Sequence, residues 1–183
     1  MKKIFAILAL ATAGAAFAGS ATVEYQAWEN PTTKADTTGL VLTVREDITK
    51  SLAGDVVLSV GQAESTKAFS GRSEVGLTYS VPFGRFTGSV RGATGLKHAS
   101  GSSDTSYYSV EPAVAYGITD KLSARVGFRF RDAYDSGVAD QTRTGRVGLS
   151  YALTKQDAIG VRYDRVRGDS ELNIVAVNYT RRF

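Results

Sequence analysis

Apolar and polar residues alternate one by one along most of this chain from Ala21 onward, and no segment shows sustained helical spacing. Residues 122–132, LSARVGFRFRD, give the clearest example: Leu, Ala, Val, Phe and Phe alternate with Ser, Arg, Gly, Arg and Arg. Because successive side chains of a strand point to opposite sides, this run predicts a strand with one apolar face and one cationic face.

Similar alternating runs recur along the chain, separated by polar or glycine-containing breaks. We expect about ten strands, although eight or twelve are also compatible with the pattern. Pro112 interrupts the sixth run, which weakens that strand or marks a bulge. The predicted strands cover residues 21–29, 38–46, 53–63, 72–81, 85–97, 106–118, 122–132, 142–153, 158–166 and 171–183.

The breaks alternate between tight turns, such as DITKS and GITDK, and generally longer polar stretches, such as NPTTKADT and AYDSGVADQ. This arrangement is typical of an all-β, antiparallel, up-and-down transmembrane β-barrel, which has short turns on its periplasmic side and longer loops outside. Ten tilted strands of this length suit the thickness of a bilayer, and closure leaves no unpaired edge.

Alternation alone does not decide whether the apolar face looks inward, as in a soluble barrel, or outward to lipid. The polar face combines small residues with arginine and few acids, whereas a soluble exterior is usually rich in both charges. Aromatic residues form two groups near the strand ends, as expected at the two membrane interfaces. The group near the short turns is Tyr79, Phe83, Phe86, Tyr116, Tyr151 and Tyr179, and the opposite group is Trp28, Tyr108, Phe130, Tyr134 and Tyr163. We therefore expect the apolar face to contact lipid.

The final residues, VAVNYTRRF, resemble the C-terminal signal of bacterial outer-membrane barrels. The resemblance implies that Tyr179 and Phe183 belong to a signal that the barrel-insertion machinery reads. Arg181 departs from it, because that position is usually apolar or aromatic in such signals.

The first residues have the order of a secretory signal: Lys2 and Lys3, an apolar run over residues 4–10, and Ala16-Phe17-Ala18 as a cleavage site. We expect residues 1–18 to be a cleaved signal peptide and residues 19–183 to form one barrel domain. The chain has no cysteine, so its fold depends on no disulfide. Without Lys2 and Lys3, 20 basic side chains accompany 18 acidic ones, a balance too even to predict a nucleic-acid partner.

The strand pattern predicts a strongly basic lumen. Some of these bases must pair with acids, since unpaired charges are costly in a dry interior, and the surplus requires water or an anion. The inward acids are Glu24, Asp55, Glu74, Glu111 and Asp164, and the inward bases are Arg45, Arg85, Arg91, Lys97, Arg125, Arg129, Arg131, Arg146, Arg162 and Arg182.

Two functions are compatible with such a lumen. The first is a narrow porin that passes small, preferably anionic solutes, such as acidic oligosaccharides, along rows of arginine. In the second, side chains fill the lumen and brace it, and the barrel is a closed structural or adhesive protein whose loops bind an external partner.

Residues 22–30, TVEYQAWEN, and residues 117–134, GITDKLSARVGFRFRDAY, resemble corresponding stretches of the oligogalacturonate-specific porin family. The resemblance implies a small barrel with an arginine-lined lumen that passes acidic oligosaccharides. Barrels of that family have more strands than the number counted here, which leaves the width of the pore open.

Two short motifs suggest other functions. His98-Ala99-Ser100, with Glu111 further on, is similar to the H-x-S pair of outer-membrane lipid A deacylases, but the longer motif near the end of that family's chain is missing here. Arg167-Gly168-Asp169-Ser170 contains an RGD tripeptide, for which a Gly-Asp hairpin turn is the simpler explanation. We predict no enzyme activity, no metal site and no cofactor. The expected surroundings are the lipid and lipopolysaccharide of a Gram-negative outer membrane.

Overall fold

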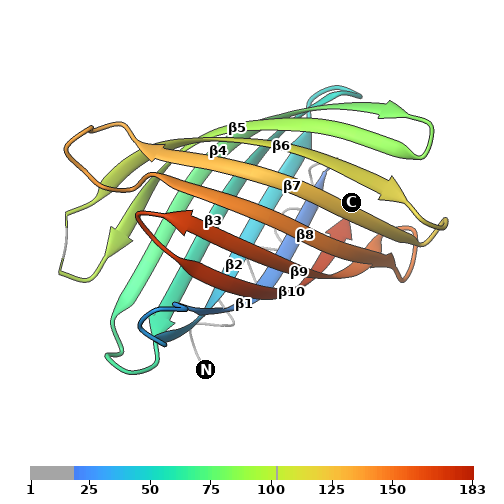
Figure 1. The fold of residues 1–183 in the computed structure, drawn as a ribbon. Coiled ribbons are helices and arrows are strands. Elements are labelled where there is room, and N and C mark those ends of the chain that lie inside the picture. Colours follow the sequence, from blue (N-terminus) through green and yellow to red (C-terminus); the bar gives the residue numbers. More distant parts are fainter. Residues whose placement is uncertain (1–18, 102) are drawn as a thin grey trace.

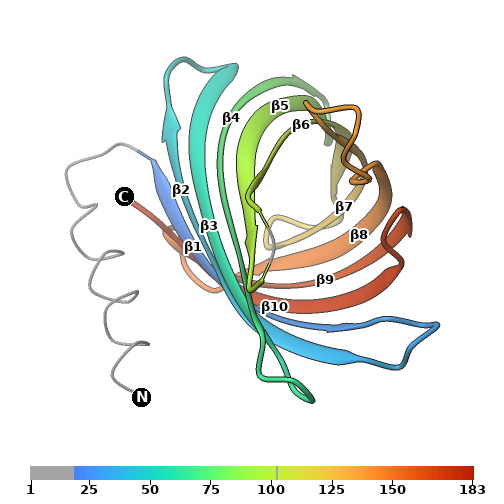
Figure 2. The same cartoon turned by 90° about the vertical axis from the view of Figure 1, so that its left-hand side faces the viewer.

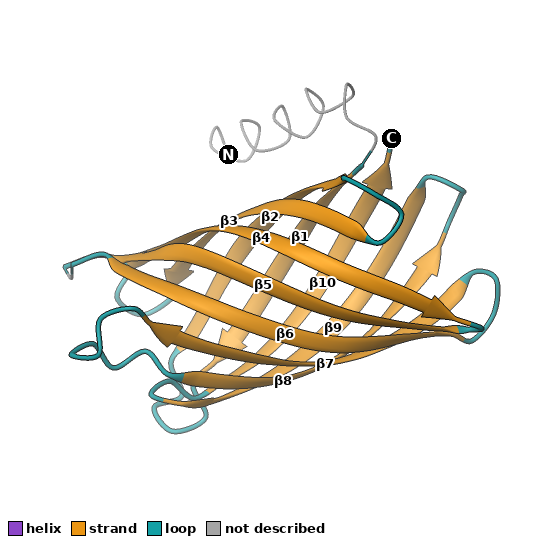
Figure 3. Ribbon diagram, turned by 90° about the horizontal axis from the view of Figure 1, so that it is seen from above, coloured by secondary structure: helices purple, strands orange, loops and turns teal. Residues whose placement is uncertain are grey.

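The computed structural model describes residues 19–101 and 103–183, which form ten strands and no helix (Figures 1 and 3). The predicted signal peptide, residues 1–18, lies outside the described residues. The strands are β1 (Ser20–Glu29), β2 (Asp36–Asp47), β3 (Leu52–Ala63), β4 (Phe69–Phe83), β5 (Phe86–Ala99), β6 (Thr105–Gly117), β7 (Leu122–Ala133), β8 (Thr142–Ala152), β9 (Asp157–Gly168) and β10 (Leu172–Arg182).

Each strand pairs antiparallel with the next strand along the chain, and β1 pairs with β10, so that the sheet closes into a barrel (Figure 2). The strands contain 10 to 15 residues, and a tilted strand needs about 9–11 to cross the hydrocarbon core of a bilayer. The prediction of a ten-stranded, up-and-down, antiparallel barrel is confirmed.

Over the described part of the chain, no helix has the length and apolar character needed to cross a bilayer.

Short turns join the strands at one end of the barrel, and generally longer connections join them at the other end, except for the three residues 169–171 between β9 and β10. The short turns, residues 48–51, 84–85, 118–121 and 153–156, lie at the right of Figure 1, and the connections at the opposite end include the eight-residue loop 134–141. Three of the short turns share one construction, in which a threonine hydroxyl accepts hydrogen bonds from backbone N–H groups two and three residues later. The threonine is the second residue of each turn: Thr49, Thr119 or Thr154. These local bonds explain why the ITKS, ITDK and LTKQ stretches form tight turns.

The fourth short turn corrects one sequence prediction. Gly84 and Arg85 connect β4 to β5, and Gly84 has a positive φ of 63°, which glycine adopts without strain. Arg85 is therefore exposed in the turn, where its guanidinium donates a hydrogen bond to the Ile118 carbonyl, and it does not face the lumen.

Pro112 leaves the strand register unchanged. Before it, Val110 of β6 pairs with Phe130 of β7, and after it Ala113 pairs with Gly127 in the same register. The pairing with β7 omits residues 111 and 112, because proline has no N–H to donate, whereas both residues stay paired with β5. The structure therefore shows an interruption in pairing rather than a bulge.

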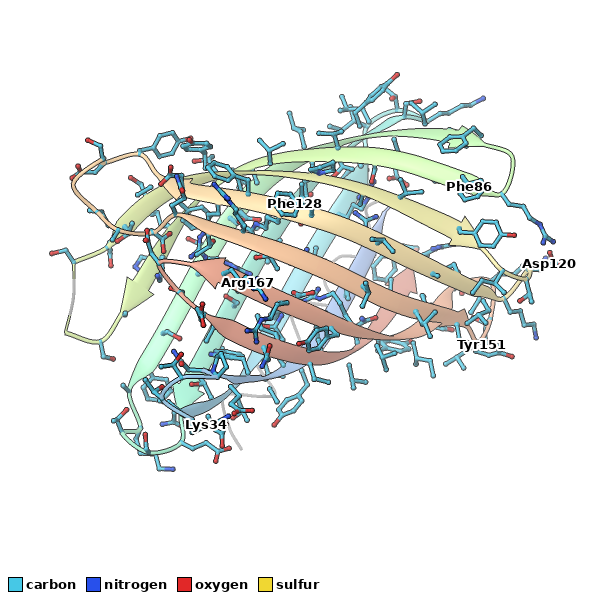
Figure 4. The ribbon with its side chains drawn as sticks, in the orientation of Figure 1. Lys34, Phe86, Asp120, Phe128, Tyr151 and Arg167 are labelled. Atoms are coloured by element: carbon cyan, nitrogen blue, oxygen red, sulfur yellow. The ribbon has the colours of Figure 1, made fainter. Side chains whose placement is uncertain are left out.

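The apolar face of the sheet looks outward. Aliphatic side chains such as Val75, Leu77, Val126 and Val177 are about half exposed on the outside of the barrel, as lipid contact requires. Aromatic side chains gather near both ends, where Phe86 stacks on Phe83 and Tyr108 lies beside Tyr134. Phe86 and Tyr151 lie at the short-turn end of the barrel, opposite Lys34 (Figure 4).

The prediction that Trp28 belongs to the lipid-facing aromatic group near the longer loops is wrong. Trp28 shares the inward row of β1 with Glu24 and Gln26, and its ring lies over Gly39 of β2 and Gly61 of β3. These two glycines leave the space that the indole fills inside the barrel. The remaining aromatic residues predicted for the two belts are on the outer face, as the register requires.

Candidate functional site: the polar lumen

Ten basic side chains occupy inward positions of the register. Nine of them are the predicted Arg45, Arg91, Lys97, Arg125, Arg129, Arg131, Arg146, Arg162 and Arg182, and the tenth is Arg72, which sequence reasoning missed. Arg72 stands two residues before the inward Glu74, so strand alternation contained the signal needed to find it. Arg85 is absent from this set because it lies in the turn.

Glu74 is the centre of one ion-pair network in the lumen. Its carboxylate accepts hydrogen bonds from Arg91 at 2.5 Å, from the Tyr107 hydroxyl at 2.8 Å and from Arg129. Arg91 also donates to both carboxylate oxygens of Asp55, with Nε at 3.0 Å from Oδ1 and 3.1 Å from Oδ2. This network, which we call the Glu74 cluster, joins β3 through β7 across the lumen.

A second network lies on the opposite wall. Arg146 donates to Glu111 at 2.7 Å and to Asp164 at 3.1 Å. Arg162 pairs with Asp164 at 3.0 Å and with Glu24 at 2.9 Å, so that β1, β6, β8 and β9 are held together. Each member of the two networks occupies an inward-facing position of its own strand. The alternation of side chains along each strand therefore explains why these residues meet in the lumen.

A loop residue completes the interior at the long-loop end. Asp140, from the loop 134–141, is 1% exposed and accepts hydrogen bonds from Lys97 and Arg131, both at 2.8 Å. Arg131 also lies 5.4 Å from the centre of the Tyr107 ring, and Tyr107 is fully buried. Sequence reasoning missed Asp140 and the inward Tyr107. Tyr107 follows the alternation, whereas no periodicity extends into the loop to predict Asp140.

A cavity of about 460 Å³ lies between the two networks. Its charged lining contains more bases than acids, with six arginines and four carboxylates. The arginines are Arg45, Arg72, Arg91, Arg125, Arg146 and Arg162, and the carboxylates are Glu24, Asp55, Glu74 and Glu111. A desolvated surplus of guanidinium groups attracts anions, which can accept two hydrogen bonds from one guanidinium.

Among the arginines of this cavity that form ion pairs, Arg45 and Arg125 have the loosest carboxylate partners and the most exposed side chains. Arg72 forms no ion pair with the described residues, and its Nε is buried without a hydrogen-bond partner. Arg45 lies 3.6 Å from Asp47, and Arg125 lies 3.6 Å from Glu111. Their side chains are 36% and 44% exposed, compared with 15% for Arg91. Both therefore keep guanidinium donors free for water or a solute, unlike the arginines at the centre of the networks.

Residues suggested for catalysis are not brought together. The His98 ring lies 2.7 Å from Asp104, the Ser100 hydroxyl donates to the Phe69 carbonyl, and Glu111 is paired with Arg146 in the lumen. The RGD tripeptide ends β9 in a turn, where the Asp169 carboxylate accepts the backbone N–H of Gln141 at 2.7 Å. Within residues 19–101 and 103–183, no group of three or more His, Cys, Asp or Glu side chains could hold a metal ion.

Of the predicted insertion signal, Tyr179 lies on the closing strand β10 and Phe183 directly follows its last residue. Tyr179 and Arg181 share the outer face of β10, and both donate to the Asp157 carboxylate, at 2.5 Å and 3.1 Å. The backbone N–H of Phe183 donates to the Gly19 carbonyl beside the start of β1. Arg181, the departure from the signal pattern, is thus accommodated by a carboxylate on the neighbouring strand.

The chain matches no protein-family model and no curated protein. Among solved structures it is similar to the KdgM porin, with 15% identity over 88% of this chain and 99% of that one and a TM-score of 0.52. The NanC porin is 10% identical over 88% and 100% of the two chains, with a TM-score of 0.53. The beta domain of the Bordetella autotransporter Brka is 11% identical over 91% and 100%, with a TM-score of 0.58. At these identities the likeness shows the fold alone, which is the outer-membrane β-barrel, with a weak resemblance to the small porins.

Proposed function

We propose that this protein is a narrow porin of a Gram-negative outer membrane that passes small anionic solutes. The observation that carries the proposal is the lining of the lumen cavity, where six arginines accompany four carboxylates. Arg45 and Arg125 supply the accessible positive charge in this lining, because their carboxylate partners are 3.6 Å away. A charged ring of this kind favours counter-ions in a pore.

The rest of the lumen limits the size of the solute. One of the similar solved structures is a KdgM porin in complex with disordered oligogalacturonate, which is an acidic oligosaccharide. In the present barrel, Tyr107, Arg129 and Asp140 are buried at the long-loop side of the cavity. We therefore expect inorganic anions and small carboxylates to cross far more readily than oligosaccharides.

The test is the reversal potential of single channels in a planar bilayer with a salt gradient. We expect the wild-type protein to prefer anions. Replacing the two loosely paired cations, in Arg45→Glu/Arg125→Glu, should reverse the sign of the selectivity because it converts the accessible charge from positive to negative. Arg85→Glu is a matched control, since Arg85 is exposed in a turn and should leave the preference for anions in place.

An open wild-type pore that is unselective or prefers cations would refute the proposed function. One observation favours the second candidate, a closed structural or adhesive barrel: the Glu74 cluster and Asp140 together fill the lumen on the long-loop side. A barrel that is folded, as judged by a different gel mobility before and after boiling, but electrically silent would establish that alternative and direct attention to the loops.

A further inference from the structure

Three arginines form a cluster on the outside of the barrel, where aliphatic and aromatic residues otherwise predominate. Arg143 of β8 is directly opposite Arg167 of β9 in the register, and Arg165 is directly opposite Gly145. All three alternate with inward residues such as Asp164 and Val166, so their side chains leave the barrel on its outer face. We call Arg143, Arg165 and Arg167 the outer arginine cluster.

The outer arginine cluster is electrostatically unfavourable by itself. Like charges directly opposite each other in an antiparallel pair destabilise the sheet. Among the residues that the structure describes, no carboxylate makes an ion pair with any of the three. The nearby carboxylates of Asp132 and Asp169 instead accept hydrogen bonds from Gln141. An anion that binds all three guanidinium groups would remove this repulsion.

The surface between these arginines is hollow. A recess of about 590 Å³ is lined by Phe128, Gln141, Arg143, Gly145, Arg165, Arg167 and Gly168. Gly145 forms its floor, and a methyl group added there would meet no atom within 4 Å. Arg165 is also held in position, because it donates to Asn173 Oδ1, which accepts a second bond from the Tyr163 hydroxyl at 2.9 Å.

An apolar groove adjoins the recess on the same outer face. Its volume is also about 590 Å³, and Phe128 lines both spaces. From Phe128 the groove extends across β7, β6 and β5, where Val126, Pro112, Val114, Gly88 and Val90 line it. Phe128 and Arg167 are labelled in Figure 4, and Arg167 lies toward the end of the barrel that carries the long loops.

The position of the recess matches a membrane interface. On β9, Tyr163 belongs to the aromatic group near the long loops, and Arg165 and Arg167 follow it toward the barrel end. The groove extends instead along aliphatic residues that face the hydrocarbon, as far as Tyr79 of the aromatic group near the short turns. The ligand that fits therefore carries negative charge at the interface and an apolar chain directed into the bilayer.

The geometry points to a binding site for lipopolysaccharide, in which the outer arginine cluster holds a phosphate group and the apolar groove holds an acyl chain. Phosphate groups accept bidentate hydrogen bonds from guanidinium groups, and an outward site at the long-loop end faces the outer leaflet. This inference depends on the barrel spanning the outer membrane but not on transport, so a silent lumen would leave it intact.

The test is native mass spectrometry of the detergent-solubilised protein with purified lipid A, the phosphorylated anchor of lipopolysaccharide. We expect one retained lipid A molecule on the wild-type barrel. Arg143→Gln/Arg165→Gln/Arg167→Gln should weaken binding at least about tenfold, which corresponds to the loss of one charge-assisted hydrogen bond. The corresponding triple lysine variant keeps the charge but loses the planar fork, and should bind with intermediate affinity.

The matched control is Lys50→Gln/Lys121→Gln/Lys155→Gln, which removes the same number of positive charges from the short turns. It should bind lipid A as the wild type does, and all variants should show the gel mobility of a folded barrel. Equal binding by the glutamine variant would overturn the inference. Equal binding of dephosphorylated lipid A would do so too, because the groove alone would then suffice. Complete displacement by equimolar inorganic phosphate would assign the recess to free phosphate instead.

Discussion

At the scale of single residues, Glu74 shows how the lumen tolerates buried charge. One carboxylate with a side chain only 2% exposed meets two guanidinium groups and a tyrosine hydroxyl. Buried ion pairs contribute little net stability, because desolvation offsets their attraction, but removing one partner leaves the others uncompensated. The arrangement is therefore more sensitive to loss of the acid than to loss of any single donor.

We predict that Glu74→Gln lowers the free energy of unfolding by about 3–5 kcal/mol, because Arg91 and Arg129 lose their shared counter-charge. Tyr107→Phe removes one hydrogen bond and should cost about 1 kcal/mol. Urea unfolding of the barrel in lipid vesicles measures both. Glu171→Gln, at an exposed loop position, is the control and should change stability by less than about 0.5 kcal/mol. Equal effects of the three substitutions would show that Glu74 has no central role.

Sequence alternation predicted most of the lumen residues but not their partners. Arg91 and Glu74 could be placed on the inward face because each lies within a regular run. Arg85 was placed there wrongly, because alternation does not reveal where a strand ends and a two-residue turn begins. The pairing of Arg91 with both Asp55 and Glu74 depends on the positions of three strands in space, which no local pattern contains.

At the scale of the elements, the wall formed by β1, β2 and β3 is built around one indole ring. A methyl group added at Gly39 would lie 2.6 Å from Cη2 of Trp28, and one added at Gly61 would lie closer still. The two glycines face each other directly in the β2–β3 register. Their lack of side chains allows the ring to lie flat against the inside of the sheet, at a position that was predicted to face the membrane.

We predict that Gly61→Ala destabilises the barrel by about 1–3 kcal/mol, because the added methyl group overpacks the space that Trp28 occupies. Trp28 is the single tryptophan of the chain, so the shift of its fluorescence maximum reports directly on the displaced ring. Gly92→Ala is a suitable control, since a methyl group there meets nothing within 4 Å. An unchanged emission spectrum and unchanged stability in Gly61→Ala would contradict this account of the wall.

The strand boundaries could be predicted closely because a membrane barrel repeats one simple rule ten times. Residues 122–132 were expected as a strand, and β7 covers Leu122–Ala133. The same rule also decides the direction in which Trp28 points, although the sequence prediction followed the chemistry of the side chain instead. A tryptophan near a strand end fits an interfacial belt by its chemistry, and only the parity that it shares with Glu24 shows that it faces inward.

At the scale of the whole molecule, positive charge is distributed differently inside and outside the barrel. Inside, acids from β1, β3, β4, β6 and β9 neutralise most of the arginines and leave a surplus in the central cavity. Outside, the outer arginine cluster lies near one end and forms no ion pair with a carboxylate of the described residues. The interior surplus supports a passage for anions and the exterior cluster supports a lipid site, so the two proposals concern separate surfaces.

Asp140 is buried in the lumen at the long-loop end. This residue joins Lys97 of β5 to Arg131 of β7 and brings the loop 134–141 into the barrel mouth. In the proposed porin, a crossing anion must take the place of Asp140 in its two charge-assisted hydrogen bonds, and this replacement is a barrier to passage. We predict that Asp140→Ala raises the rate of anion passage about tenfold, since each such bond contributes about 1.5–3 kcal/mol and 1.4 kcal/mol corresponds to a factor of ten.

Single-channel recordings and uptake of chloride into vesicles measure this effect. Asp135→Ala removes an acid from the same loop. The Asp135 carboxylate is exposed and accepts a hydrogen bond from the backbone N–H of Gly137 within that loop, so passage should stay at the wild-type rate. Removing Asp140 also leaves Lys97 and Arg131 unpaired at the mouth, which should strengthen the preference for anions. If Asp140→Ala folds and passes anions no faster than the wild type, Asp140 is not a barrier to passage, and the Glu74 cluster limits the rate instead.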